Sequence, residues 1–317
     1  MYGRENYNKV KLLILERRNE AIAGAEARAH HVRLLNPEIA KIDSELSKTG
    51  LLIFKTACAG ESIDKIRERN TELTKLRARE LEKIGYPADY TEVKYTCPTC
   101  QDTGFSDAGM CSCMRELLIK ENIASSGIGA LMDRQSFENF DLSWYGDNAK
   151  NYEEMKRGFE RAKSYAENFK IPGSPNLLIM GMTGTGKTHV STAIAKRVIE
   201  RGYEVLYDTA QNIIDAFEND KFRRPYGQGA ELQGEKFLEC DLLIIDDLGT
   251  EFTTPFALSC LYNILNTRQN KGLPTVMSTN LTSSAFNSKY EDRIYSRMVG
   301  ADSQILIFKG RDYRLHR

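Results

Sequence analysis

A glycine-rich segment in the second half of the chain carries residue types that can hold phosphate groups. Residues 181–188 read Gly-Met-Thr-Gly-Thr-Gly-Lys-Thr, which fits the spacing G-x-x-x-x-G-K-[ST]. Glycines let the backbone turn tightly so that its amides point at phosphate oxygens, and a following helix N-terminus adds partial positive charge. An apolar run precedes the segment and a helical pattern follows it. This context favours a phosphate-binding loop over an ordinary glycine-rich turn.

Such a loop binds the phosphates of a nucleoside triphosphate together with Mg²⁺. Lys187 is expected to bridge the β- and γ-phosphates, and the Thr188 hydroxyl to bind Mg²⁺. The predicted ligands are Gly181, Thr183, Gly184, Thr185, Gly186, Lys187 and Thr188.

Two acidic residues and an asparagine follow later apolar runs. Asp246 and Asp247 end the run 242–245, so that Asp246 can hold Mg²⁺, directly or through water, and Asp247 can orient or deprotonate an attacking water. Asn280 follows the run 274–279 and should face the same crevice, because ligand sites of parallel sheets lie at the carboxyl ends of strands. Helix capping by the two acids and a turn role for Asn280 are the alternatives.

Four of the seven cysteines lie within 17 residues, at Cys97, Cys100, Cys111 and Cys113. Four thiolates can surround a tetrahedral Zn²⁺, and a closed site of this kind is structural because it leaves no open position for a substrate water. Reduced thiols without metal, a redox pair and an iron–sulfur cluster are the alternatives. The remaining cysteines, Cys58, Cys240 and Cys260, are expected to be small buried hydrophobes.

The loop and the acids need a sheet to position them. Five strands are expected with helical patterns between them, which predicts a mostly parallel α/β sheet; the ranges are 176–180, 204–208, 242–246, 275–279 and 304–308. We expect residues 151–317 to form this ATPase domain, residues 121–150 to be a linker, and residues 89–120 to be the zinc module.

Residues 1–88 are expected to be helical. Asn36 before Pro37 marks a helix start, and Gly50 is expected to end that helix. A second apolar stripe begins at Ile63 and stops at Gly85. These apolar faces form either a self-contained helical bundle or a docking surface for a partner protein.

Composition and charge restrict the classes of protein and of binding partner that the sequence allows. Hydrophobic residues make up 41 % of the 317 residues, which allows a sizeable core, while 44 basic and 44 acidic side chains leave no overall bias toward nucleic acid or membranes. No signal peptide and no run long enough to span a bilayer are apparent, so we expect a cytoplasmic protein without a membrane partner. Local DNA contacts could come from a basic and aromatic run, namely Lys221, Phe222, Arg223, Arg224 and Tyr226, although a solvated loop is the simpler interpretation.

Taken together, the phosphate loop, the double acid and Ser278-Thr279-Asn280 resemble the AAA+ ATPases. Within them, residues 243–249 and 278–281 are similar to the DnaC/DnaI helicase loaders and the IstB transposition ATPases. The resemblance covers about residues 135–317. It implies a parallel sheet of strand order 5-1-4-3-2 and Asn280 as the sensor-1 residue. We expect no helical lid of the kind that many AAA+ proteins carry, because little of the given sequence follows the last expected strand; this departs from the AAA+ pattern and resembles the loader branch.

Further site residues follow from this resemblance alone. Arg297, with Arg293 as second choice, would be the arginine finger that enters a neighbouring subunit's ATP site, unless it is a surface arginine in a salt bridge. Arg314, with Arg311 close behind, would belong to the sensor-2 region. One departure is Asp247, where most AAA+ proteins have Glu, so the shorter side chain is less suited to act as general base.

The implied activity is ATP hydrolysis coupled to loading of the replicative DNA helicase onto single-stranded DNA, with self-assembly through the arginine finger. The zinc module after a helical start resembles DnaI-type loaders, although four cysteines at this spacing depart from their pattern. The alternatives are an IstB-like ATPase that delivers a transposase to target DNA, and a nucleotide-gated adaptor with negligible hydrolysis.

Overall fold

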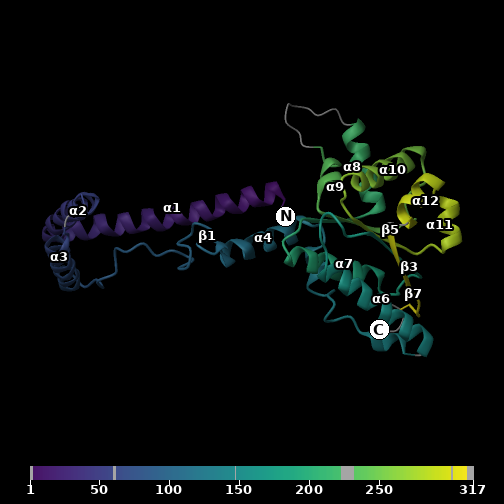
Figure 1. Ribbon diagram of the computed structural model, residues 1–317, viewed down its shortest axis with the longest axis horizontal. Helices are drawn as coiled ribbons and strands as arrows, with labels where there is room; N and C mark the ends of the chain where they lie inside the picture. The colour runs from purple at the N-terminus through teal and green to yellow at the C-terminus, as the bar shows by residue number, and fades with distance from the viewer. Residues whose placement is uncertain (1–2, 60–61, 147, 223–231, 301–302, 313–317) are drawn as a thin grey trace. The chain divides into compact units, whose positions relative to one another are not determined.

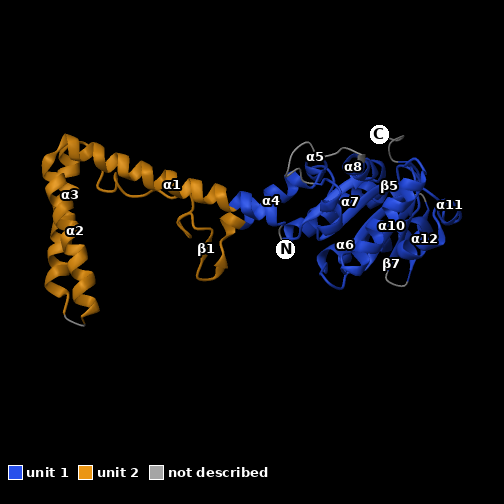
Figure 2. Ribbon diagram, turned by 90° about the horizontal axis from the view of Figure 1, so that it is seen from above, with its two compact units in different colours: residues 1–10, 115–317 blue, residues 11–114 orange. Residues whose placement is uncertain are grey.

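The computed structural model describes residues 3–59, 62–146, 148–222, 232–300 and 303–312. The chain divides into two compact units, which Figure 2 colours separately. Unit 1 consists of residues 1–10 and 115–317, and unit 2 of residues 11–114. Each unit is described by itself.

Unit 2 contains most of α1 (Arg4–Leu35), together with α2 (Pro37–Cys58), α3 (Asp64–Lys83) and a hairpin of β1 (Phe105–Ser106) and β2 (Gly109–Met110). Asn36 caps α2 as expected, because its side chain accepts a hydrogen bond from the Glu38 amide at 3.0 Å. The helix does not end at Gly50, however. One glycine costs a helix only about 1 kcal/mol, and α2 continues to pack against α3, where Asn70 donates to the Thr49 hydroxyl at 2.8 Å. Cys58, predicted to be buried, is exposed at the end of α2.

The sheet of unit 1 has five strands, all parallel, in the order β4-β5-β6-β3-β7. Their bounds are β3 (Asn176–Gly181), β4 (Val205–Thr209), β5 (Leu242–Leu248), β6 (Thr275–Thr279) and β7 (Ser303–Phe308). Numbered along the chain and read from the β7 edge, this order is 5-1-4-3-2. The expected fold class and strand order are therefore confirmed.

Helices cover both faces of this sheet (Figure 1). Leu177 and Ile179 pack into one core with α6 (Ala149–Glu167) and α7 (Lys187–Glu200), while Leu178 and Met180 face a second core on the other side. The helices of the second side are α8 (Ala210–Phe222), α9 (Glu235–Glu239), α10 (Pro255–Asn270), α11 (Ser283–Lys289) and α12 (Asp292–Val299). Burial on both faces explains why the strands are continuously apolar. Among the helices of the described ranges, none combines the length and the hydropathy that a bilayer-spanning segment requires.

The segment expected to be a linker, residues 121–150, is folded onto the sheet. It holds the end of α4 (Ser112–Ser125), α5 (Gly129–Met132) and the 3-10 helix η1 (Leu142–Tyr145). Ile128, Met132 and Phe137 belong to the core that α6 and α7 form. The linker prediction is wrong because the serines and glycines near residue 127 make a single turn, after which apolar side chains are buried.

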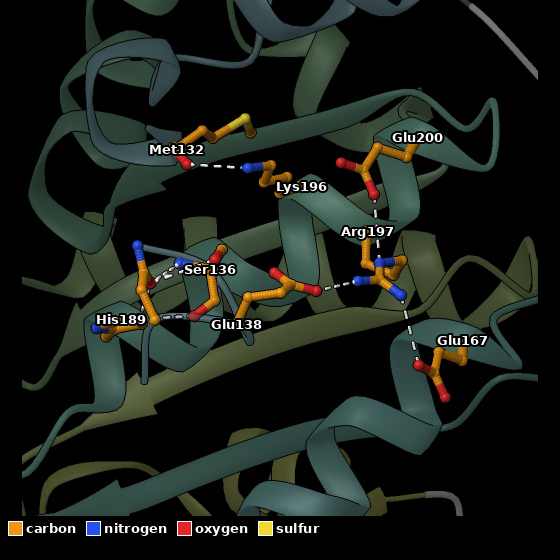
Figure 3. A network of polar contacts seen from close by, with 9 residues as sticks. Met132, Ser136, Glu138, Glu167, His189, Lys196, Arg197 and Glu200 are labelled. Atoms are coloured by element: carbon orange, nitrogen blue, oxygen red, sulfur yellow. Dashed lines mark hydrogen bonds and ion pairs between the residues drawn. The ribbon is translucent and has the colours of Figure 1, made fainter. Parts of the chain in front are cut away.

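Polar contacts hold this segment to α7 (Figure 3). Arg197 of α7 forms ion pairs with Glu138 at 2.6 Å, Glu200 at 3.2 Å and Glu167 at 3.4 Å. About two turns earlier along α7, the His189 Nε2 lies 2.8 Å from the Ser136 carbonyl. The segment is therefore part of the fold of unit 1 and lies beside the glycine-rich loop.

Candidate nucleotide-binding site

The phosphate loop connects β3 to α7 in the expected way. Gly184 and Gly186 have φ of 74° and 85°, in the left-handed region that glycine tolerates best. A Cβ on Gly186 would lie 2.8 Å from the Phe140 ring, so this glycine also permits close packing. Lys187 begins α7 and is buried, with its Nζ donating to the Met182 carbonyl at 2.9 Å. The loop thus holds its lysine at the N-terminus of α7, where anions are favoured.

Asp246 and Thr188 meet beside this loop. The Thr188 hydroxyl donates to Asp246 Oδ2 at 3.0 Å. Two adjacent ligands of an octahedral Mg²⁺ lie about 2.9 Å apart, since each binds at about 2.0–2.1 Å. The pair therefore fits Mg²⁺ in both spacing and oxygen chemistry.

Two further hydroxyls, which the sequence analysis did not identify, hold the same carboxylate. Tyr207 donates to Asp246 Oδ2 at 2.5 Å, and Ser278 donates to Oδ1. Burial and the nearby Asp246 carboxylate raise the pKa of Tyr207, so its hydroxyl remains a donor. No sequence motif marks Tyr207, because its role arises from pairing of β4 with β5.

A bulge separates the two acids. The register of β5 against β6 shifts between Ile245 and Leu248, and Asp247 has φ of 53°. The Asp247 amide donates to Ser278 Oγ at 3.0 Å. Bulges redirect side chains, and here Asp246 is buried while Asp247 is exposed. The exposed acid is the one that can reach a water.

A cavity of about 570 Å³ lies over the loop. Its polar end is lined by Lys187, Thr188, Asp247 and Asn280, so the structure brings together the residues expected from three separate motifs. The other end is formed by the segment mistaken for a linker and by His189; its residues include Leu131, Arg134, Gln135, Asn139, Phe140, Asp141, Trp144 and Tyr145. A volume of this size suits a nucleotide.

His189 also lines this second end of the cavity. Its ring packs edge-on against Phe140, and burial lowers the pKa of His189, which keeps the ring neutral at pH 7. The aromatic run at residues 137–140 was the available signal for this end of the site.

The arginines expected from the resemblance lie elsewhere. Arg297 is on α12, where its guanidinium donates to Asn266 Oδ1 at 2.8 Å and stacks over the Tyr262 ring at 4.6 Å. Arg293 is exposed on the same helix. Neither lines the cavity of its own chain, which is compatible with action on a neighbouring subunit and equally with a structural role.

Several expected residues lie outside the described part. Arg314 does so, and so do Arg223, Arg224 and Tyr226 of the basic run. Of the rest of that run, Lys221 lies in the last turn of α8 with its Nζ 4.9 Å from the centre of the Phe256 ring.

The four clustered cysteines converge in unit 2. Their sulfur atoms all lie within 4.8 Å of one another, with Cys97 and Cys111 at 3.8 Å and Cys100 and Cys113 at 3.5 Å. Sulfur atoms around a tetrahedral Zn²⁺ are about 3.8 Å apart, given zinc–sulfur bonds of about 2.3 Å. The cluster therefore fits zinc.

Local backbone structure brings these cysteines together. Asp102, with φ of 53°, accepts hydrogen bonds from the amides of Thr96 and Cys97 and closes the first turn. The β1–β2 hairpin then returns the chain to the second pair. Burial opposes ionisation of Cys100, but the Gly104 amide and the neighbouring thiols outweigh it and lower the pKa of Cys100 to about 7.

Comparison with known proteins places the chain in a family. The model of the IstB-like ATP binding protein family matches residues 132–317, which is more than half of the chain. The replicative helicase loader DnaC of Escherichia coli K12 is 28 % identical over 200 residues, covering 63 % of this chain and 77 % of the relative. The phage-like element PBSX protein XkdC of Bacillus subtilis is 26 % identical over 248 residues, covering 73 % and 88 %.

Among solved structures, a crystal structure of the DnaC helicase loader has a TM-score of 0.48 and 18 % identity, covering 56 % of this chain and 98 % of that one. The family match begins at Met132, whose carbonyl accepts a hydrogen bond from Lys196 of α7. The matched residues include the phosphate loop, both acids and Asn280. The chain belongs to the IstB-like ATP-binding proteins, which are AAA+ ATPases of the DnaC type.

Proposed function

We propose that this protein is an ATP-hydrolysing loader that places a replicative DNA helicase on single-stranded DNA. The observation that carries the nucleotide chemistry is the cavity in which Lys187, Thr188, Asp247 and Asn280 meet. The loader role is supported by the similarity to DnaC, which extends over 77 % of that protein.

The geometry supports a distinct role for each residue of the proposed ATPase site. Lys187 and the loop amides bind the β- and γ-phosphates, while Thr188 and Asp246 hold Mg²⁺. When bound, Mg²⁺ neutralises charge on the phosphate oxygens. Asp247, which lies in the bulge of β5 and is exposed, accepts the proton of the attacking water, and the Asn280 amide orients that water.

The partners are proposed from the family and from the two units. Unit 2, with its helical hairpin, would contact the helicase, and the Cys97–Cys113 cluster would hold zinc for stability. The ATPase unit would assemble on DNA in the ATP state and release after hydrolysis, which requires different DNA affinity in the two nucleotide states. A second candidate, transposase delivery, is favoured by the IstB-like family match.

Two substitutions test the ATPase site. Lys187→Ala should lower ATP affinity by about a hundredfold, because the phosphates lose a buried charge. Asp247→Asn should preserve ATP binding and abolish turnover, because the amide cannot take a proton. Equilibrium binding and phosphate release, each with and without single-stranded DNA, measure both effects.

Three outcomes would contradict parts of the proposal. Absence of ATP binding by the unaltered chain would overturn it entirely. Binding without turnover, even on DNA, would indicate a nucleotide-gated adaptor. Affinity purification that recovers a transposase in place of a hexameric helicase would support the second candidate.

A further inference from the structure

Tyr207 connects two parts of unit 1, because its side-chain hydroxyl and its backbone amide form hydrogen bonds with different segments. It lies on β4 and is 8 % exposed. Its hydroxyl reaches Asp246 Oδ2 at 2.5 Å, the same oxygen that accepts from Thr188 at 3.0 Å. The side chain therefore contacts the carboxylate that the proposed function assigns to Mg²⁺.

The backbone of Tyr207 is bound to the turn after α4. Its amide donates to the Ser126 carbonyl at 2.9 Å. Gly127 follows with φ of 88°, and a Cβ there would lie 2.6 Å from the Tyr207 carbonyl oxygen. Because β4 is the edge strand of the sheet, the turn at residues 126–127 covers the exposed backbone of that strand.

The start of β4 is held by α4 as well. Asn122 of α4 donates to the Tyr203 carbonyl at 3.4 Å and accepts from Asn6 of α1 at 2.7 Å. Asn6 also donates to the Ser125 hydroxyl at 2.8 Å. The last turns of α4 thus contact the residue two positions before β4, and the first turn of α1 is joined to α4.

We propose that Tyr207 is a positioning residue that ties the orientation of the Asp246 carboxylate to the turn at residues 126–127. Displacement of this turn moves β4 and withdraws the Tyr207 hydroxyl, which leaves Asp246 less well oriented toward Mg²⁺. The inference rests on the proposed nucleotide chemistry and adds a control point to it. Carboxylates that bind metal are commonly oriented by such outer partners, whose loss weakens metal affinity by about tenfold or more.

Tyr207→Phe tests the hydroxyl contact in the full-length protein. The ring and its packing remain, so binding of fluorescent ADP in EDTA should equal that of the unaltered chain. The Mg²⁺ concentration that gives half of the metal-dependent gain in affinity should rise about tenfold. A merely structural role would instead lower the thermal midpoint and weaken binding with and without metal.

Gly127→Ala tests the link to the turn. The added Cβ meets the Tyr207 carbonyl, and the same rise in Mg²⁺ requirement is expected. Gly85→Ala is the matched control, because Gly85 also has a positive φ, of 83°, but has no atom within 4 Å of the added Cβ. It should leave the Mg²⁺ dependence unchanged.

The outcomes separate this inference from the proposed function. If the unaltered chain shows no metal-dependent nucleotide binding, the proposed function itself fails. If it shows such binding and Tyr207→Phe has the same Mg²⁺ dependence, only the role of Tyr207 is overturned. If Tyr207→Phe shifts the dependence and Gly127→Ala does not, the link to the turn is overturned.

Discussion

At the scale of single residues, the molecule separates two neighbouring acids by their surroundings. Asp246 is buried and accepts from three hydroxyls, those of Thr188, Tyr207 and Ser278. Asp247 is exposed beyond a bulge and lines the cavity. A metal ligand benefits from a fixed carboxylate, whereas a proton acceptor must reach a water, so the surroundings of the two acids support the different roles that we propose for them.

The cysteine cluster gives a prediction at the same scale. The purified chain should contain one zinc, and Cys100→Ser should reduce the content severely because three thiolates bind much more weakly than four. Acidification should release zinc, because the metal requires thiolates and protons compete for them as pH falls. Metal analysis across a pH series measures this, with Cys260→Ser as a control outside the cluster; unchanged zinc in Cys100→Ser would contradict the assignment.

At the scale of elements, residues in the segments between helices and strands form hydrogen bonds that hold neighbouring elements together. Asn36 both caps α2 and donates to Glu80 of α3 at 3.0 Å. Glu251, which follows β5, also connects two segments: its carboxylate accepts hydrogen bonds from the Gly249 amide and the Tyr290 hydroxyl, each at 2.7 Å. The loop that follows Asp247 is thereby bound to Tyr290, which lies just before α12, the helix that carries the candidate arginines.

Asn36 provides a prediction for the helical hairpin. Asn36→Ala should destabilise it by about 1 kcal/mol, because the helix loses its cap. Asn36→Ser keeps a capping oxygen and loses only the part-buried hydrogen bond to Glu80, so it should cost less. Thermal unfolding followed by circular dichroism compares the two variants, and equal losses would show that the Glu80 contact, and not the cap, stabilises the hairpin.

At the scale of the whole molecule, the ATP site contains phosphate-binding residues but no arginine of α12 among its lining residues. If Arg297 acts on a neighbouring subunit, turnover must depend on assembly. The alternative is a structural role, since Arg297 also joins α12 to α10 through hydrogen bonds to Asn266 and Tyr262.

Mixing two inactive variants distinguishes these possibilities. Arg297→Ala should lower turnover by about a hundredfold or more, because the transferring phosphoryl group loses a stabilising charge. Adding Lys187→Ala subunits should restore part of the rate, since they supply the arginine to intact sites. Arg293→Ala is the matched comparison. A lowered thermal midpoint of Arg297→Ala without any restoration would identify Arg297 as a structural anchor, and restoration of Arg293→Ala in its place would identify Arg293 as the finger.

The sequence by itself determined the strands, their order through the family resemblance, the phosphate loop, the paired acids and the cysteine cluster. These are short-range signals: glycines at fixed spacing, apolar runs that are buried on both faces, and four thiols within one module. The helix cap at Asn36 belongs to the same class, because a cap depends on adjacent residues only.

Tertiary structure decided the rest. Residues 121–150 read as a linker because their serines and glycines are local turn signals, while burial of Ile128 and Phe137 depends on α6 and α7. Helix α2 passes Gly50 because packing against α3 outweighs a local preference. Tyr207 acquires its contact with Asp246 only when β4 pairs with β5, since hydrogen bonds between residues 39 positions apart leave no periodic trace in the chain.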